Sequence, residues 1–134
     1  MRRLPWRFLL VLALALPAGA AQAAPDARAD GEIRHLLDFV STSGCTFIRN
    51  GDPHDAASAA GHLAMKYGKA KSRLATTEQF IEHVASKSFF TGQAYRVQCA
   101  GTAAHNSGDW LRAELARWRQ ARGGADAVAA RAAH

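Results

Sequence analysis

Two cysteines constrain the fold of this chain more than any other residues do. Cys45 and Cys99 are the only cysteines among its 134 residues, and a disulfide between them would leave no thiol unpaired. Such a bond persists in an oxidising compartment and stabilises a small domain by roughly 4 kcal/mol in the chain-entropy model. The alternative, Cys45 as a nucleophile, requires a neighbouring base, and the local sequence supplies none.

The N-terminal residues predict that the protein is exported from the cytoplasm to an oxidising compartment. Arg2, Arg3 and Arg7, an apolar run over 8–16 and small residues up to the cleavage site form the three parts of a signal peptide over residues 1–23. The apolar run is shorter than the roughly 20 residues that span a bilayer. We therefore expect a periplasmic protein with no transmembrane segment after cleavage.

The remaining chain has the size of one domain, and its charge is modest. We predict a single domain over residues 24–122 and a flexible alanine-rich tail over 123–134, which has few side chains to bury. Loss of the three arginines of the signal peptide lowers the net charge from +6 to +3. This excess of positive charge is too small to indicate nucleic acid as a partner.

The first helix is predicted to begin after Asp30, whose side chain can cap it. Residues 24–29 precede it without periodicity and are expected to be loose. The helix should end near Ser43-Gly44. Its buried face follows the helical spacing i, i+3, i+4 and i+7, at Ile33, Leu36, Leu37 and Val40.

A β-hairpin is predicted next, over residues 45–54. Asn50-Gly51 favours a type I′ turn, and Pro53 restricts the returning strand to a sheet edge. A further strand over 95–99 shows the alternation of a half-buried strand. If this strand pairs antiparallel with the first, Cys45 and Cys99 become neighbours, which agrees with the predicted disulfide.

Three more helices complete the predicted fold. Asp55 and Thr76 are suited to cap the second and third, and either Ser107 or Asp109 to start the fourth. We therefore predict an α+β domain with about four helices, a two- or three-stranded antiparallel sheet and one disulfide. The expected buried faces are Ala56, Ala59, Ala60, Leu63, Tyr67, Ala70 and Leu74 in the second helix, Phe80, Ile81 and Val84 in the third, and Leu111, Leu115 and Trp118 in the fourth, with Trp110 at its margin.

A set of short motifs is spread over most of the domain. They are Ser43-Gly44-Cys45, Phe47, Arg49-Asn50-Gly51, Ala60, His62-Leu63, Lys66-Tyr67, Phe80-Ile81, Ala85-Ser86-Lys87-Ser88, Gly92, Tyr95, Cys99 and Trp110-Leu111. This set resembles a family of small secreted bacterial proteins of unknown function, the YfeK-like family. The resemblance implies a single periplasmic domain and no particular chemistry.

One flank of the second helix is the candidate binding surface. Its basic or titratable side chains fall within about 60° of one another on a helical wheel. An ordinary solvated flank would show the same pattern, whereas a binding flank would meet an anionic envelope component or the acidic patch of an envelope protein. The candidate binding residues are His62, Lys66, Lys69 and Arg73 on this flank, with Asn50 and His54 from the hairpin.

Metal and catalytic sites have weaker support. His62 with Met65, or with His54, offers copper-type ligands, but Met65 points about 60° away from His62. His35 and His83 are expected to face outward from other helices. Ser86 and Lys87 would form a serine–lysine pair, yet adjacent helical side chains diverge. The chain contains no nucleophile elbow, zinc-protease helix motif, phosphate-binding loop or Cys-x-x-Cys.

Function is therefore predicted only in outline. We expect an uncharacterised periplasmic, non-catalytic binding or accessory protein that engages an envelope partner, without metal or cofactor. The alternatives are a hydrolase-type enzyme with an unrecognised site and a His/Met metal-handling protein. A deep pocket that gathers His54, His62 or Ser86 with a carboxylate would favour the enzyme.

Overall fold

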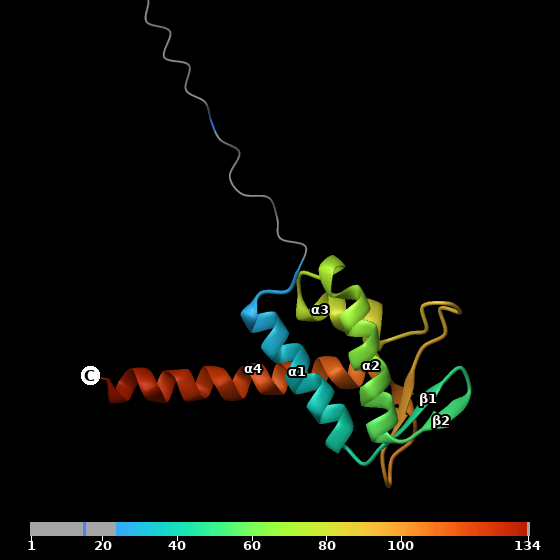
Figure 1. Ribbon diagram of the computed structural model, residues 1–134. Coiled ribbons are helices and arrows are strands. Elements are labelled where there is room, and N and C mark those ends of the chain that lie inside the picture. Colours follow the sequence, from blue (N-terminus) through green and yellow to red (C-terminus); the bar gives the residue numbers. More distant parts are fainter. Residues whose placement is uncertain (1–14, 16–23, 134) are drawn as a thin grey trace, which may run out of the picture.

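A computed structural model describes residue 15 and residues 24–133. Apart from residue 15, the predicted signal peptide lies outside the described residues. The described elements form an α+β fold (Figure 1). In chain order they are α1 (Ala27–Thr42), β1 (Thr46–Arg49), β2 (Asp52–His54), α2 (Ala56–Ala70), the 3₁₀ turn η1 (Lys71–Arg73), α3 (Thr77–Phe80), the π-helical turn η2 (Ile81–Ala85), β3 (Arg96–Gln98), β4 (His105–Asn106) and α4 (Ser107–Ala132).

Helix α1 begins earlier than the sequence predicted. Asp26, not Asp30, is its N-cap, and the Asp26 side chain accepts a hydrogen bond of 2.8 Å from the amide of Ala29. The expectation of a loose segment over 24–29 was therefore wrong from residue 27 onward. Ala29 is buried, so the added turn contributes to the core as well as satisfying its own amides.

The sheet is antiparallel and has the order β2-β1-β3-β4. Asn50 and Gly51 both have positive φ, 50° and 83°, which confirms the type I′ turn. Pro53 lies in β2 at the edge of the sheet, as predicted. The fourth strand was not predicted, because His105 and Asn106 lie in a polar stretch with no apolar alternation and pair with β3 over two positions.

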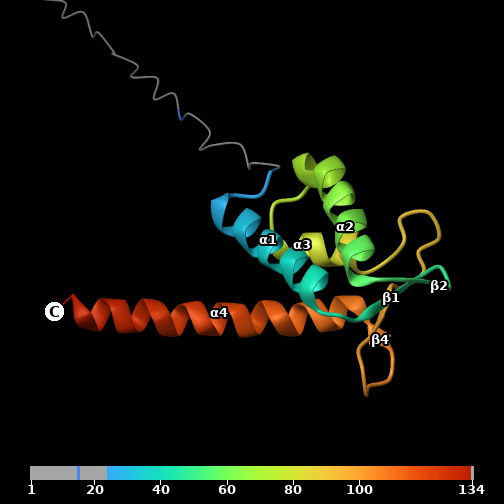
Figure 2. The same ribbon diagram turned by 60° about the horizontal axis from the view of Figure 1, so that its bottom comes forward.

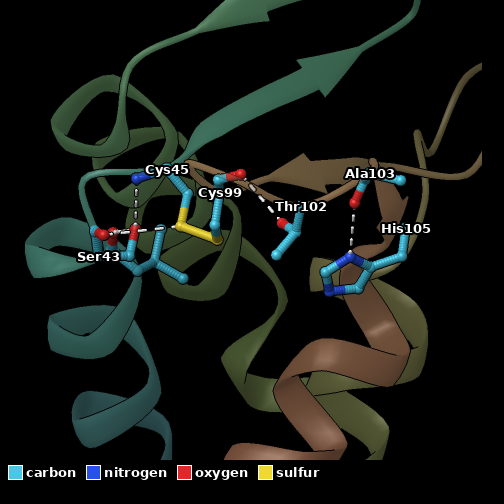
Figure 3. The surroundings of a disulfide bond; sticks show 7 residues. Ser43, Cys45, Cys99, Thr102, Ala103 and His105 are labelled. Carbon is cyan, nitrogen blue, oxygen red and sulfur yellow. Dashed lines mark hydrogen bonds between the residues drawn. A yellow bond between two sulfur atoms is a disulfide. The ribbon is translucent and has the colours of Figure 1, made fainter.

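A disulfide joins Cys45 and Cys99, which confirms the central expectation from the sequence. The two Cα atoms are 4.3 Å apart, and the adjacent pair in the register is Thr46 with Gln98. Figure 3 shows the bond at the end of the paired strands, where the Thr102 hydroxyl donates a 2.9 Å hydrogen bond to the Cys99 carbonyl. The disulfide thus ties β1 to β3 across a long intervening segment.

The helices pack together beside the beginning of α4, with the sheet at that end of the molecule (Figures 1 and 2). Asp55 and Thr76 are the N-caps of α2 and α3, as predicted: the Asp55 carboxylate accepts from the Ser58 amide and the Thr76 hydroxyl from the Gln79 amide. Helix α2 ends at Ala70, before η1. The largest side chains that are almost fully buried are Phe80, Ile33, Leu36, Ile81, Leu111, Val40 and Val97.

Helix α4 continues beyond the packed core. Residues 123–132 are helical and exposed, so the predicted tail has a regular conformation while burying little surface. Its flexibility stays a prediction. In Figure 2 this half of the helix extends away from the other elements. None of the helices in the described part of the chain combines the length and apolar character needed to cross a membrane.

His35, on the flank of α1 that faces α4, does not point to solvent as predicted. The sequence placed His35 toward solvent, but this ring stacks on Trp118 with centroids 3.7 Å apart, and its Nε2 lies 2.7 Å from Glu114 Oε1. The polar side chain is accommodated because α4 brings both an aromatic face and a carboxylate to it. Trp110 instead packs against the aromatic rings of Phe39 and Phe47, at the edge of the core.

Candidate functional site

The candidate site lies where the β-hairpin meets α2. In β1, alternation places Phe47 and Arg49 on one face, and His54 of β2 is the cross-strand partner of Phe47. In α2, His62 and Lys66 are four residues apart and therefore share a helix face. The hairpin and α2 thus bring basic side chains from three elements to one surface.

A small pocket marks this junction. It encloses about 20 Å³, enough for about one water molecule. His54 and His62 line it together with Arg49, and no carboxylate is among its lining residues. Its full lining is Phe47, Ile48, Arg49, His54, Ala59, His62, Leu63, Tyr95 and Ser107.

His62 is the least satisfied polar group of the site. Its Nε2 is buried, and it is the one buried side-chain nitrogen or oxygen without a hydrogen-bond partner among the described residues. Burial lowers the pKa of His62 first, and the positive charges of Arg49, Lys66 and His54 lower it further. A negative charge placed beside this ring would oppose all of these causes.

Lys66 has a more structural role than the sequence indicated. Its Nζ donates hydrogen bonds to the Val84 carbonyl at 2.6 Å, the Lys87 carbonyl at 3.3 Å and the Tyr95 hydroxyl at 3.0 Å. Three contacts use all three hydrogens of an ammonium group. Burial, and then the charge of Arg49, lower the pKa of Lys66 to about 8. Lys66 therefore joins α2 to the end of η2 and contributes positive charge to the site.

The remaining predicted residues occupy different surroundings. Lys69 and Arg73 are exposed, and Arg73 belongs to η1 because α2 ends at Ala70. At the hairpin turn, the Asn50 Oδ1 accepts a 2.8 Å hydrogen bond from the Thr91 hydroxyl. The structure thus brings His54 and His62 together, draws Lys66 inward and leaves the other two basic residues at the surface.

The arrangement of side chains gives little support to metal binding or to hydrolysis at Ser86. No group of three or more His, Cys, Asp or Glu side chains within the described ranges is arranged to hold a metal ion. Met65 is 51% exposed, whereas His62 turns toward the hairpin pocket. The Ser86 hydroxyl donates its hydrogen bond to the Ile81 carbonyl, and Ser86 is not part of the pocket that holds the two histidines.

Arg49 and Tyr95 also line the site, although neither was predicted as a site residue. Arg49 lies two residues after Phe47, so strand alternation could have placed it on the same face. Tyr95 is buried, and its ring lies edge-on to His62 at a centroid distance of 6.4 Å. Tyr95 was expected only to begin a half-buried strand, because its contacts with Lys66 and His62 of α2 depend on tertiary packing.

Comparison with known proteins places the chain in a family. A model described as a family of unknown function (DUF5329) matches residues 27–119. The chain belongs to this family. It is also 39% identical over 88 residues to the uncharacterized protein YfeK of Salmonella typhimurium strain LT2, which covers 65% of this chain and 71% of the relative. The YfeK-like resemblance is therefore confirmed, and no solved structure matches the chain.

Neither description assigns an activity. The matched range includes the hairpin, α2 and both cysteines, and it ends within α4. What is established for this chain is thus a DUF5329 domain of unknown function with one disulfide.

Proposed function

We propose that this protein is a non-catalytic binding protein of the bacterial periplasm that recognises an anionic group of an envelope partner at the hairpin–α2 pocket. The observation that carries the proposal is that Arg49, His54 and His62 line one pocket without a carboxylate in its lining, and that Arg49 and His54 lie close enough for their charges to act on His62. Clustered positive charge attracts anions and steers their approach. The partner is an envelope protein with an acidic patch or another anionic component of the envelope.

The unpartnered His62 nitrogen supports an anion as the bound group. A buried imidazole nitrogen without a partner costs free energy, and an acceptor from outside the molecule would satisfy its protonated form. Binding of an anion would in turn favour protonation of His62, against the burial and neighbouring charges that lower its pKa. Affinity for the anionic partner should therefore increase as the pH falls toward 5.

The size and composition of the pocket favour recognition over catalysis. Small-molecule sites are usually clefts of roughly 300–1,000 Å³, whereas this pocket encloses about 20 Å³. A hydrolytic site also needs a general base held beside a nucleophile. Ser86 is hydrogen-bonded to the Ile81 carbonyl and lies outside the pocket, and Ser107, the serine that lines the pocket, is only 1% exposed. A partner would therefore contact the mouth of the pocket and present its charge there.

Photocrosslinking in intact cells tests the binding surface. A photoreactive residue at position 54 should capture a defined envelope component, and Arg49→Glu in the same protein should reduce that capture at least about tenfold. The matched controls are a photoreactive residue at position 116, on exposed α4, and the charge reversal Arg112→Glu. Equal capture with Arg49→Glu and Arg112→Glu, or no capture above background from position 54, would contradict the proposal.

The compartment has its own test. Osmotic-shock fractionation should release the protein with the periplasmic contents, and sequencing of its N-terminus should begin at Ala24. Export through the predicted signal peptide would also oxidise Cys45 and Cys99, so thiol alkylation before reduction should leave both unmodified. Recovery of full-length, reduced protein from the cytoplasm would refute the periplasmic location.

A further inference from the structure

A braced loop next to the candidate site exposes two adjacent aromatic rings. Phe89 is 80% exposed and Phe90 is 95% exposed, and their rings meet edge to face with centroids 5.8 Å apart. Two other large hydrophobic side chains among the described residues are similarly exposed, Met65 and Val128, and each stands alone in its sequence neighbourhood. Contiguous exposed apolar surface is a feature of sites that contact a protein or a membrane.

The loop holds this arrangement through its own hydrogen bonds. The Ser88 amide donates to the Gln93 carbonyl and the Gly92 amide to the Ser88 carbonyl, both at 2.9 Å. Ser88 is buried, which anchors the base of the loop. The Thr91 hydroxyl bonds to Asn50, so the loop is also braced against the hairpin turn. The two rings are thus presented to solvent by ordered backbone.

The loop and the hairpin turn project from the same end of the molecule. In Figures 1 and 2 both lie away from the C-terminal end of α4. The charges near the loop are mainly positive. Lys87 precedes the aromatic pair, and the Lys87 carbonyl accepts a hydrogen bond from Lys66 Nζ. Lys66 in turn lies close enough to Arg49 for the charge of Arg49 to lower the pKa of Lys66. Between Glu82 and Asp109 the sequence contains no acidic residue. Asp52, opposite Arg49 across the hairpin, is the one carboxylate of the turn.

We propose that Phe89 and Phe90 insert into the interface of an anionic phospholipid bilayer while the adjacent, exposed side chain of Lys87 contacts its headgroups. Two aromatic side chains bury roughly 300–500 Å² together, which is less than the roughly 800 Å² per partner of a standard protein interface. The strength of binding at a membrane interface depends on the apolar area inserted and on the attraction between basic groups and anionic lipids, and the loop supplies both. The loop therefore fits a lipid surface better than a protein partner.

This inference rests on the proposed periplasmic location, where the protein meets membrane surfaces, but it uses residues outside the hairpin–α2 pocket. The two proposals can therefore fail separately. Loss of vesicle binding in loop variants with unchanged crosslinking from position 54 would separate the membrane contact from the pocket. Crosslinking that depends on Arg49, without any vesicle binding, would refute the membrane contact and leave the pocket proposal standing.

Vesicle co-sedimentation tests the membrane contact. The protein purified from the periplasm should bind vesicles of phosphatidylethanolamine with phosphatidylglycerol and not vesicles of phosphatidylcholine alone. Phe89→Ser/Phe90→Ser should weaken binding at least about tenfold, since both insertable rings are lost. Val128→Ser, which removes an exposed apolar side chain from distant α4, should leave binding unchanged. Equal binding by the two variants, or no binding of the wild-type protein, would overturn the proposal.

A fluorescence measurement separates insertion from electrostatic adsorption. In a Phe90→Trp variant, brominated lipids in the same anionic vesicles should quench the added tryptophan emission, measured as the difference from wild-type protein. Adsorption through charge alone would bind the protein without that quenching and would also overturn the proposal. Because both rings are exposed, the variants should keep the wild-type circular dichroism and melting temperature.

Discussion

Charged side chains are arranged differently in two regions of the molecule. One region is the contact between α1 and α4, and the other is the hairpin–α2 pocket. At the first, the buried carboxylate of Glu32 accepts two hydrogen bonds from Arg119, at 2.7 Å and 2.9 Å. At the second, Arg49, His54 and His62 converge without a carboxylate in the pocket lining. One region holds matched charges inside the fold, and the other leaves like charges beside one another.

The two regions also differ in how their surroundings affect the pKa of the central side chain. Hydrogen bonds from Arg119 hold the pKa of Glu32 below its usual value despite burial, so the ionised pair is the stable state of that contact. Around His62 burial and neighbouring positive charges act together against protonation. The α1–α4 charges are therefore matched within the fold, whereas we propose that an anion from a partner matches the pocket charges.

The largest change in the free energy of unfolding is expected when the ion pair between α1 and α4 is removed. Arg119→Ala leaves the buried Glu32 carboxylate without its charged partner, which should lower the free energy of unfolding by about 3 kcal/mol. The matched control is Arg112→Ala, because Arg112 faces Asp109 at 3.4 Å where both side chains are exposed. That control should cost less than about 0.5 kcal/mol. Urea unfolding at pH 7 measures both, and similar losses would contradict the structural role of the Arg119 pair.

A smaller effect is expected at Asp30 and depends on pH. Its carboxylate accepts hydrogen bonds from Arg34 and Tyr67, and these contacts lower its pKa from 3.8 to about 2. Because the folded state binds the proton more weakly than the unfolded state does, this stabilisation is complete above pH 4 and is lost as the pH falls toward 2. Asp30→Asn should cost about 1.5 kcal/mol at pH 7. In urea titrations the difference from wild type should shrink between pH 4 and pH 2, and a constant difference would reject this origin.

Lys66 lies beside the pocket but is expected to contribute to the stability of the fold. Lys66→Met removes the donor to the Val84 and Lys87 carbonyls and should lower the free energy of unfolding by about 1 kcal/mol. Lys69→Met, on the exposed side of the same helix, should change it by less than about 0.5 kcal/mol. Thermal unfolding of the two variants distinguishes them. If Lys69→Met is the more destabilising change, Lys66 is not the tie between α2 and η2.

The smallest expected effect is a change of protonation in the pocket. Arg49→Gln removes a positive charge that lowers the pKa of His62, so that pKa should rise toward its ordinary value. Nuclear magnetic resonance titration of the His62 ring measures the midpoint. Arg112→Gln, which acts on no pocket histidine, is the control. An unchanged midpoint in Arg49→Gln would show that the two side chains do not interact as described.

Much of the fold could be predicted because its determinants are local. The turn conformation at Asn50-Gly51, the edge position of Pro53 and the cap at Asp55 each follow from the chemistry of a few adjacent residues. The cysteines then fixed the pairing of two distant strands. Strand β4 was missed because its residues are polar and are held by pairing with β3, which no local pattern signals.

The candidate site was predicted only in part, since its chemistry depends on contacts between distant elements. A helical wheel correctly grouped His62 with Lys66, but it could not show that η2 supplies carbonyl acceptors that draw Lys66 inward. It also placed Arg73 on the helix, although α2 ends three residues earlier. His35 was assigned to solvent because the approach of α4 is a tertiary feature.

We propose the hairpin–α2 pocket, which Arg49, His54 and His62 line without a carboxylate, as the anion-binding surface of this domain. The most direct test is a two-dimensional nuclear magnetic resonance titration of the labelled protein with a poly-glutamate peptide at pH 6 and low salt. Shifts concentrated at Arg49, His54 and His62 are expected, and they should be abolished in Arg49→Glu and retained in Arg112→Glu. Shifts confined to the arginines of α4, or equal binding by the two variants, would contradict it.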